Sequence, residues 1–303
     1  MACQFEITLS NSEPAGVSLA QQALDKADHL EQQLTIFRDT SEVSLVNRYA
    51  ASEPVQISSS LFRLLQLCLN LYQETQGAFD ITSSPLSHCW GFIKRAGRIP
   101  LPEELEEAKL RVGSDKLALD SRSRTIAFIH SGVCLNLGSI GKGYALDCMK
   151  EFMQAKVRAA LLNAGASSFY AIGDGAGLGG WEIGIRHPKF LERRMAWLRL
   201  NDVAMATSGS EEQFFEHEGK RFGHIIDPRS GLPAESVASV TVVAKSAAIA
   251  DALATAFYVG GRTLAETYCE LHDDILVVLL ESEADLPIIL GNRQLAEVEI
   301  LHA

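Results

Sequence analysis

Leu137-Gly138-Ser139-Ile140-Gly141-Lys142-Gly143-Tyr144-Ala145 links an apolar strand, expected at 133–137, to a helix, expected at 141–155. Glycines there let backbone amides approach an anion, the start of the helix presents N–H groups, and Lys142 adds a positive charge. An ordinary helix start with a surface lysine explains the same residues equally well. The stretch is not a P-loop, because Asn136 and Gly143 stand where that motif requires Gly and Ser or Thr.

Strand and helix patterns alternate on both sides of this junction. Strands are expected at about 3–10, 125–129, 133–137, 158–163, 167–172, 181–186, 196–200, 203–206, 237–243, 274–280 and 294–301. Helices are expected from Pro14 to about 34 and at 60–75, 103–109, 141–155, 246–258 and 261–271. The chain shows no internal repeat and no linker. These patterns predict a single α+β domain over residues 1–303.

Composition excludes several classes of protein. Lys and Arg total 27 against 38 Asp and Glu, a formal net charge of −11, and no basic run exceeds Arg193–Arg194. A nucleic-acid reader is therefore not expected. No stretch approaches the roughly 20 apolar residues of a membrane span, and the N-terminus lacks a signal-peptide pattern. Six cysteines without zinc-ligand spacing suggest buried thiols. The sequence predicts a cytoplasmic protein.

One polar pair stands on an otherwise apolar helix. Asp251 and Thr255 are four residues apart, so they share a helix face. A carboxylate and a hydroxyl are hard oxygen ligands suited to Mg²⁺ that a substrate phosphate also holds. Alternatively, Asp251 pairs with a distant Arg, and Thr255 bonds back to the helix carbonyl four residues earlier.

Three further segments carry polar or glycine patterns. His224 and Asp227 flank the turn Asp-Pro-Arg-Ser-Gly at 227–231, and a histidine there is either a general base or a partner of the turn. Phe79 and Trp90 could bind a flat ring, but core is the default interpretation of such aromatics. The G-x-G-x-x-G match at 175–180 precedes an expected strand instead of a helix, so a flexible hairpin loop is the better explanation.

Five separate blocks in this order resemble the ApbE family of FAD:protein FMN transferases. They are Asp39-Thr40-Ser41-Glu42-Val43-Ser44-Leu45-Val46-Asn47; Gly77-Ala78-Phe79-Asp80 with Pro85-Leu86 and Trp90-Gly91-Phe92; Leu137 to Asp147; Ala206-Thr207-Ser208-Gly209 with His224-Ile225-Ile226-Asp227-Pro228-Arg229-Ser230-Gly231; and Ala250-Asp251-Ala252-Leu253-Ala254-Thr255. The resemblance covers nearly the whole chain.

The resemblance implies a T-fold-like α+β architecture with a mixed sheet and flanking helices. It also implies Mg²⁺-dependent transfer of the FMN half of FAD onto a threonine or serine of a target protein with a D-[GS]-x-T-type motif, releasing AMP. By position, His224 and Asp251 are the catalytic residues, and Ser139, Asp251 and Thr255 are the metal ligands. The implied FAD-binding residues are Asn47, Phe79, Asp80, Trp90, Lys142, Ser208 and Asp227.

The chain departs from the family pattern at one turn. The block usually written N-x-G-G-[DN] is Asn163-Ala164-Gly165-Ala166-Ser167 here. If residue 166 requires a positive φ, alanine is strained there. Two other functions remain compatible with the same residues: a Mg²⁺-dependent FAD pyrophosphatase that gives FMN and AMP, and a non-catalytic FAD-binding protein.

Overall fold

The computed structural model describes residues 3–9, 15–175, 177–190, 192–209 and 213–301. The described residues form two compact units. The first unit comprises residues up to 31 together with 140–209 and 236–303, and the second comprises 32–139 and 210–235. The α+β class is confirmed, whereas the single domain over 1–303 stays a prediction. Pro14, the expected start of the first helix, lies outside the described residues.

A seven-stranded sheet forms the centre of the first unit, in the order β1-β5-β6-β9-β12-β13-β14. Its strands are β1 (Phe5–Leu9), β5 (Ala160–Ala164), β6 (Ser168–Ile172), β9 (Ala204–Gly209), β12 (Val237–Ala244), β13 (Ile275–Glu281) and β14 (Ile288–Gly291). All of its pairings are antiparallel, so the expected mixture of strand directions is absent from the described residues. Sequence neighbours such as β5 and β6 pair through short turns, which antiparallel strands allow.

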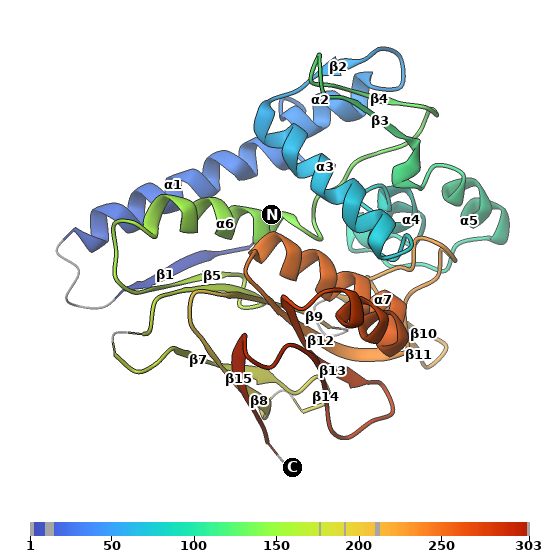
Figure 1. Cartoon of the computed structure of the whole chain (residues 1–303). Coiled ribbons are helices and arrows are strands. Elements are labelled where there is room, and N and C mark those ends of the chain that lie inside the picture. Colours follow the sequence, from blue (N-terminus) through green and yellow to red (C-terminus); the bar gives the residue numbers. More distant parts are fainter. Residues whose placement is uncertain (1–2, 10–14, 176, 191, 210–212, 302–303) are drawn as a thin grey trace. The chain divides into compact units, whose positions relative to one another are not determined.

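Helices cover one face of this sheet and a small sheet covers the other. α1 (Gly16–Leu34) and α6 (Gly141–Met153) pack on β5 and β6, and α7 (Ala247–Leu271) packs on β9 and β12 (Figure 1). β7 (Trp181–Arg186), β8 (Arg194–Leu200) and β15 (Ala296–Ile300) form the opposite layer. β12 is buried along its whole length because it lies between these layers.

α7 is continuous by hydrogen bonding but is broken at Gly261, whose φ of 69° and ψ of −167° are not helical. Two helices, 246–258 and 261–271, were expected here, and the break lies at the junction between them. Only glycine adopts this backbone region without steric cost. The first part of α7 therefore carries Asp251 and Thr255 on a segment that ends at Gly260.

The second unit is built from short elements. Its helices are α2 (Glu42–Tyr49), α3 (Ser59–Glu74), α4 (Ser84–Cys89) and α5 (Pro102–Lys109), with the 3₁₀ turns η1 (Phe92–Lys94) and η2 (Ser114–Lys116). β2 (Val55–Gln56), β3 (Leu117–Asp120) and β4 (Thr125–Phe128) form one antiparallel sheet, and β10 (Phe214–His217) and β11 (Lys220–Gly223) form a hairpin. The predicted amphipathic helix is confirmed as α3, with Leu61, Leu64, Leu65 and Cys68 buried as expected and Leu71 buried in addition.

The expected strand at 133–137 is wrong. These residues have no regular secondary structure and join no sheet. Asn47 instead satisfies both backbone polar groups of Leu135, and Asn136 N–H donates to the Ile81 carbonyl. After the glycine motif at 175–180, of which residue 176 lies outside the described residues, the expected strand is confirmed as β7, but the predicted hairpin is wrong, because β6 and β7 belong to different sheets.

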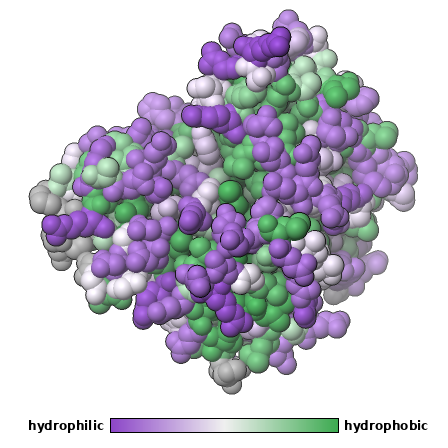
Figure 2. Space-filling model, in the orientation of Figure 1, coloured by the Kyte–Doolittle hydropathy of each residue, from purple (hydrophilic) through white to green (hydrophobic). Residues whose placement is uncertain are grey.

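On the face drawn in Figure 2, hydrophilic side chains alternate with smaller hydrophobic areas. Single exposed apolar residues are normal on a protein surface. Among the helices of the described residues, none has the length and apolar character needed to cross a bilayer.

Candidate functional site

Asp251 lies on the first part of α7 and is 5% exposed. Gly143 N–H, at the start of α6, donates to Asp251 Oδ2 at 3.0 Å. Ser168, the first residue of β6, donates its hydroxyl to Asp251 Oδ1 at 3.4 Å. Both donors are far from Asp251 in sequence, and they come from two other elements of the first unit. A buried carboxylate requires such partners.

Thr255 extends the polar face of α7 by one turn. Its hydroxyl bonds back to the Asp251 carbonyl at 3.4 Å, as one of the two sequence interpretations expected. It also lies 3.3 Å from the hydroxyl of Ser208 on β9. The carboxylate of Asp251 and the hydroxyls of Thr255 and Ser208 thus form a set of hard oxygen atoms within one unit.

Gly143 permits the close packing of α6 against α7. A Cβ at this position would lie 2.1 Å from the Ala247 carbonyl oxygen, so no side chain fits without movement of the backbone. This contact brings the Gly143 N–H within bonding distance of Asp251. The sequence pattern predicted an anion-binding turn at Gly143 but gave no indication of its contact with α7.

Lys142, one residue earlier, is half-buried, and its Nζ donates to Ser167 Oγ at 2.6 Å. Ser167 follows Ala166, whose φ of 57° is the left-handed conformation that the sequence flagged as a source of strain. The Ala166 N–H is held by Asn163 Oδ1 at 2.9 Å. Ser167, one of the two residues that depart from the family pattern, therefore holds Lys142, the lysine predicted to contact FAD.

In the second unit, Asp80 is 6% exposed and saturated with hydrogen bonds. Its Oδ1 accepts from Thr82 N–H, Thr82 Oγ1 and Ser114 Oγ, each at 2.7 Å, and its Oδ2 accepts from Ser114 N–H at 3.2 Å. Burial raises the pKa of Asp80, while the hydrogen bonds from Ser114 and Thr82 act in the opposite direction. The carboxylate ties its own turn to the segment at 113–114.

The two predicted aromatic residues are core residues in this structure. Phe79 has no exposed surface, and its N–H donates to Thr75 Oγ1 at 3.1 Å. Trp90 donates its ring N–H to the Gly231 carbonyl at 2.8 Å and packs on Phe222, with ring centroids 5.7 Å apart. The default interpretation of these aromatics as core describes their environment, and their roles toward FAD stay predictions.

His224 follows the β10–β11 hairpin. Its Nδ1 lies 3.1 Å from the Gln213 carbonyl oxygen. Its ring and that of Phe92 are arranged edge to face, with ring centroids 6.5 Å apart. Gln213 in turn donates its amide to the Phe92 carbonyl at 2.9 Å. Phe92 and Gln213, the two residues in contact with His224, also line a hollow of about 330 Å³, together with Arg95, Gly97, Phe214 and Phe215. A carbonyl at Nδ1 fixes the orientation of an imidazole ring, as a general base requires.

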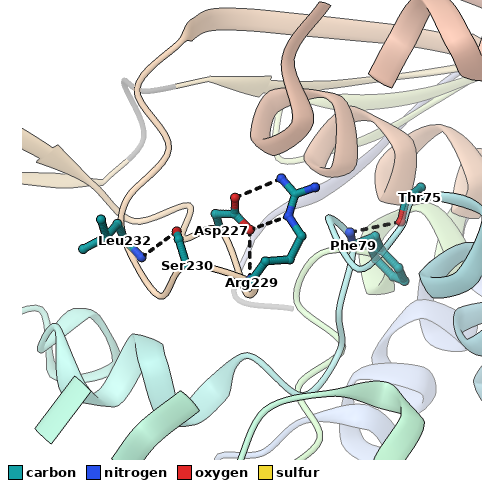
Figure 3. Close-up of polar contacts among 6 residues, drawn as sticks. All are labelled: Thr75, Phe79, Asp227, Arg229, Ser230 and Leu232. Carbon is teal, nitrogen blue, oxygen red and sulfur yellow. Dashed lines mark hydrogen bonds and ion pairs between the residues drawn. The ribbon is translucent and has the colours of Figure 1, made fainter. Parts of the chain in front are cut away.

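Asp227 closes the turn after His224. Its carboxylate accepts two bonds from the Arg229 guanidinium, at 2.8 and 2.9 Å, and one from the Arg229 N–H (Figure 3). These hydrogen bonds raise the pKa of Arg229. Ser230 Oγ accepts from Leu232 N–H at 3.2 Å within the same turn. Both carboxylate oxygens of Asp227 are thus engaged by its own turn.

Asn47 and Ser139 complete the predicted set. Asn47 Nδ2 donates to the Leu135 carbonyl at 3.0 Å, and Leu135 N–H donates to Asn47 Oδ1 at 2.7 Å. Asn47 thereby supports the segment that leads to Ser139. Ser139 is half-buried and ends the second unit, directly before Ile140 of the first. Its metal-binding role stays a prediction.

Three contact residues of the site were not found from the sequence as partners: Gly143 and Ser168 at Asp251, and Ser167 at Lys142. Gly143 and Ser168 lie 108 and 83 residues from Asp251. Local periodicity carries no information about such distant contacts. The only available indication was the departure at Ala166 and Ser167 from the family pattern.

The described residues contain no group of three or more His, Cys, Asp and Glu side chains that could hold a metal ion. A metal at Asp251 would therefore complete its coordination with hydroxyl, carbonyl or phosphate oxygens. The Thr255 and Ser208 hydroxyls fit that requirement, because Mg²⁺ prefers oxygen ligands and binds in proteins through one or two carboxylates plus substrate phosphates.

This fold and these residues define a class of α+β proteins in which a helix on an antiparallel sheet presents a carboxylate–hydroxyl pair. The chain belongs to the ApbE family, whose sequence model matches residues 1–279.

Two curated relatives and one solved structure illustrate the similarity. The FAD:protein FMN transferase of Haemophilus influenzae is 31% identical over 259 residues, covering 82% of this chain and 75% of that protein. The protein of the same name from Treponema pallidum is 32% identical over 246 residues, covering 76% and 68%. The crystal structure of the ApbE protein of Thermotoga maritima has a TM-score of 0.86 at 27% identity, covering 96% and 94%.

Proposed function

We propose that this protein transfers the FMN moiety of FAD to a threonine or serine hydroxyl of a target protein with a D-[GS]-x-T-type motif and releases AMP. The observation that carries the proposal is the carboxylate–hydroxyl pair of Asp251 and Thr255, with Ser208 beside it. Membership of the ApbE family and relatives named FAD:protein FMN transferase support the same activity.

Asp251, Thr255 and the Ser139 carbonyl are the proposed Mg²⁺ ligands. When bound, Mg²⁺ would offset the charge of the FAD pyrophosphate and the charge that develops at the attacked phosphorus. A positive charge at the site is needed because the chain has a net charge of −11 and otherwise repels an anionic substrate. Lys142, placed by Ser167, would add a positive charge for the phosphates.

In the proposed step, the target hydroxyl oxygen attacks the FMN phosphorus of FAD. A phosphorus–oxygen bond to the target forms, the bond from that phosphorus to the bridging oxygen breaks, and AMP leaves with the electron pair. His224 would accept the hydroxyl proton, because a hydroxyl is a weak nucleophile without a base. Asn47, Phe79, Asp80, Trp90, Ser208 and Asp227 remain the proposed FAD-site residues. Asn47, Asp80 and Asp227 make hydrogen bonds to other residues of the protein. These three residues would therefore support FAD binding by holding turns in place.

The test is one incubation of the protein with FAD, Mg²⁺ and a peptide or domain carrying a D-G-A-T-type motif. Intact-mass measurement is expected to show an FMN adduct on the target, and chromatography is expected to show free AMP. Free FMN and AMP without an adduct would favour the FAD pyrophosphatase, and intact bound FAD would favour a binding protein.

His224→Ala is expected to lower the transfer rate by about 100-fold or more while FAD still binds. FAD binding is measured separately by flavin fluorescence, so that a lost site is distinguished from a lost base. Full transfer by this variant would remove His224 from the mechanism.

A further inference from the structure

The start of α7 is held by a carboxylate that projects from α6. Asp147 Oδ1 accepts from Ala247 N–H at 2.8 Å, and Oδ2 accepts from Ser246 Oγ at 2.6 Å and from Ala248 N–H at 3.0 Å. Ser246 is the N-cap of α7, and its hydroxyl oxygen accepts from Ile249 N–H at 3.3 Å. The first N–H groups of a helix lack partners within the helix, and a negative charge there is favourable. The Asp147 carboxylate thus accepts hydrogen bonds from the first two N–H groups of α7 and from its N-cap hydroxyl.

The same two helices meet again one turn away. Gly143 precedes Asp147 by four residues on α6, and Asp251 follows Ala247 by four residues on α7. Gly143 N–H bonds to Asp251, and Asp147 bonds to Ala247, so the contacts run in opposite directions along the two helices. Two contacts one turn apart fix both the position of α7 along its axis and its rotation about that axis.

At Gly143 the backbones of α6 and α7 are packed closely together. A Cβ there would meet the Ala247 carbonyl oxygen at 2.1 Å, so the backbones already touch at this point. α7 can pivot about this contact unless a second contact holds it. Asp147 supplies further contacts at the start of α7, to Ser246 Oγ and to the Ala247 and Ala248 N–H groups, and Gly143 N–H at Asp251 holds the helix one turn further along.

We propose that Asp147 is a positioning residue that holds Asp251 and Thr255 in the orientation needed to bind the metal. The inference rests on the proposed Mg²⁺-dependent function and adds to it a residue for which sequence analysis gave no role. Outer residues that orient metal ligands typically change metal affinity by 10- to 100-fold when they are replaced.

The variant is Asp147→Asn, which keeps the size of the side chain but loses its charge and turns one acceptor into a donor. Ser58→Ala is the matched control. Ser58 is the N-cap of α3 in the second unit, and its hydroxyl accepts from Leu61 N–H at 3.2 Å. Both variants weaken the start of a helix, so both are expected to lower the thermal midpoint.

The discriminating measurement is binding of Mn²⁺, followed by electron paramagnetic resonance with and without FAD. Asp147→Asn is expected to raise the apparent Kd for Mn²⁺ about 10-fold, whereas Ser58→Ala leaves it unchanged. In turnover, Asp147→Asn is expected to raise the KM for Mg²⁺ and to regain most of the wild-type kcat at saturating Mg²⁺.

An Asp147→Asn protein that is destabilised but binds Mn²⁺ with wild-type affinity would overturn the inference and leave the proposed function intact. If this variant fails to fold, Ser246→Ala replaces it, because it removes one of the three Asp147 contacts and is expected to raise the Kd by a smaller factor. Unchanged affinity in Ser246→Ala would likewise count against the inference. A wild-type protein that binds no Mn²⁺, with or without FAD, would overturn the proposed function together with the inference.

Discussion

Asp80 and Asp251 are buried to nearly the same degree, one in each unit, and both were predicted from the sequence to act in the site. Asp80 accepts four hydrogen bonds from Thr82 and Ser114, residues of its own turn and of the segment packed on it. Asp251 accepts from Gly143 and Ser168, which belong to a helix and a strand elsewhere in the first unit. The first carboxylate organises a turn, whereas the second is oriented by the tertiary fold.

The hydrogen-bond partners of a buried carboxylate distinguish one that stabilises the fold from one that is available to a ligand. A carboxylate filled by strong local donors costs stability when it is removed, because those donors lose their partner. A carboxylate oriented by distant elements, with the Thr255 hydroxyl one turn along the same helix, is suited to a ligand. Exchanging each carboxylate for its amide therefore separates the two roles.

The largest expected effect is on turnover in Asp251→Asn. The amide keeps the shape of the side chain and can still accept from Gly143, but it loses the negative charge that a metal requires. Transfer is expected to fall by about 100-fold or more, with a change in unfolding free energy below about 1 kcal/mol. Activity is followed by AMP release across a Mg²⁺ titration, and stability by urea unfolding. Activity independent of Mg²⁺ in the wild type would defeat the metal assignment.

Asp80→Asn is expected to show the opposite pattern. Its Oδ1 accepts three donors, and an amide nitrogen near Ser114 or Thr82 would leave buried groups unsatisfied. The unfolding free energy is expected to fall by about 2 kcal/mol, and FAD affinity is expected to fall modestly with it, because Asp80 supports FAD binding by holding its turn. Weaker FAD binding at unchanged stability would instead favour the direct FAD contact that the family resemblance implied.

The smallest expected effect is on the stability contributed by Glu104, a surface carboxylate that can be compared with the two buried ones. The Arg98 guanidinium bonds to Glu104 at 2.8 and 3.0 Å and lowers the pKa of that carboxyl. A folded pKa below the unfolded value of about 4.3 gives a stability contribution that is present above that value and is lost as pH falls through the folded pKa. Glu104→Gln is expected to lower the urea midpoint slightly at about pH 7 and to match the wild type at about pH 2. An equal difference at both pH values would show that the charge of Glu104 is not the cause.

Sequence patterns predicted five of the seven α-helices and most strands of the described residues, because these depend on local periodicity. The helical spacing of Asp251 and Thr255 placed both on one face, and the back-bond of Thr255 was anticipated. The strand at 133–137 was predicted wrongly because its apolar residues follow the pattern of a buried strand. In the structure the Asn47 side chain, instead of a neighbouring strand, bonds to the backbone N–H and carbonyl of Leu135. α2 and the six-residue α4 were missed, because such short segments give little periodicity, although α5, also eight residues long, was expected at 103–109.

The donors at the site could not be predicted for a different reason. Gly143 and Ser168 contact Asp251 only after the sheet has formed and α6 has packed on α7. Family resemblance named the ligands without naming what holds them. The partners of Asp80 were equally out of reach, because Ser114 lies in a separate segment of the second unit.

The turn between β5 and β6 has a consequence for insertions and deletions. It pairs Ala164 with Ser168, so three residues separate the strands, and neighbouring serines serve different helices: Ser167 holds Lys142 and Ser168 holds Asp251. Because side chains alternate along a strand, one residue gained or lost would turn Ser168 to the opposite face of the sheet. The turn accommodates an alanine at a positive φ, but its length is coupled to both helices at once. Relatives with a longer or shorter turn would need other residues to hold the lysine and the carboxylate.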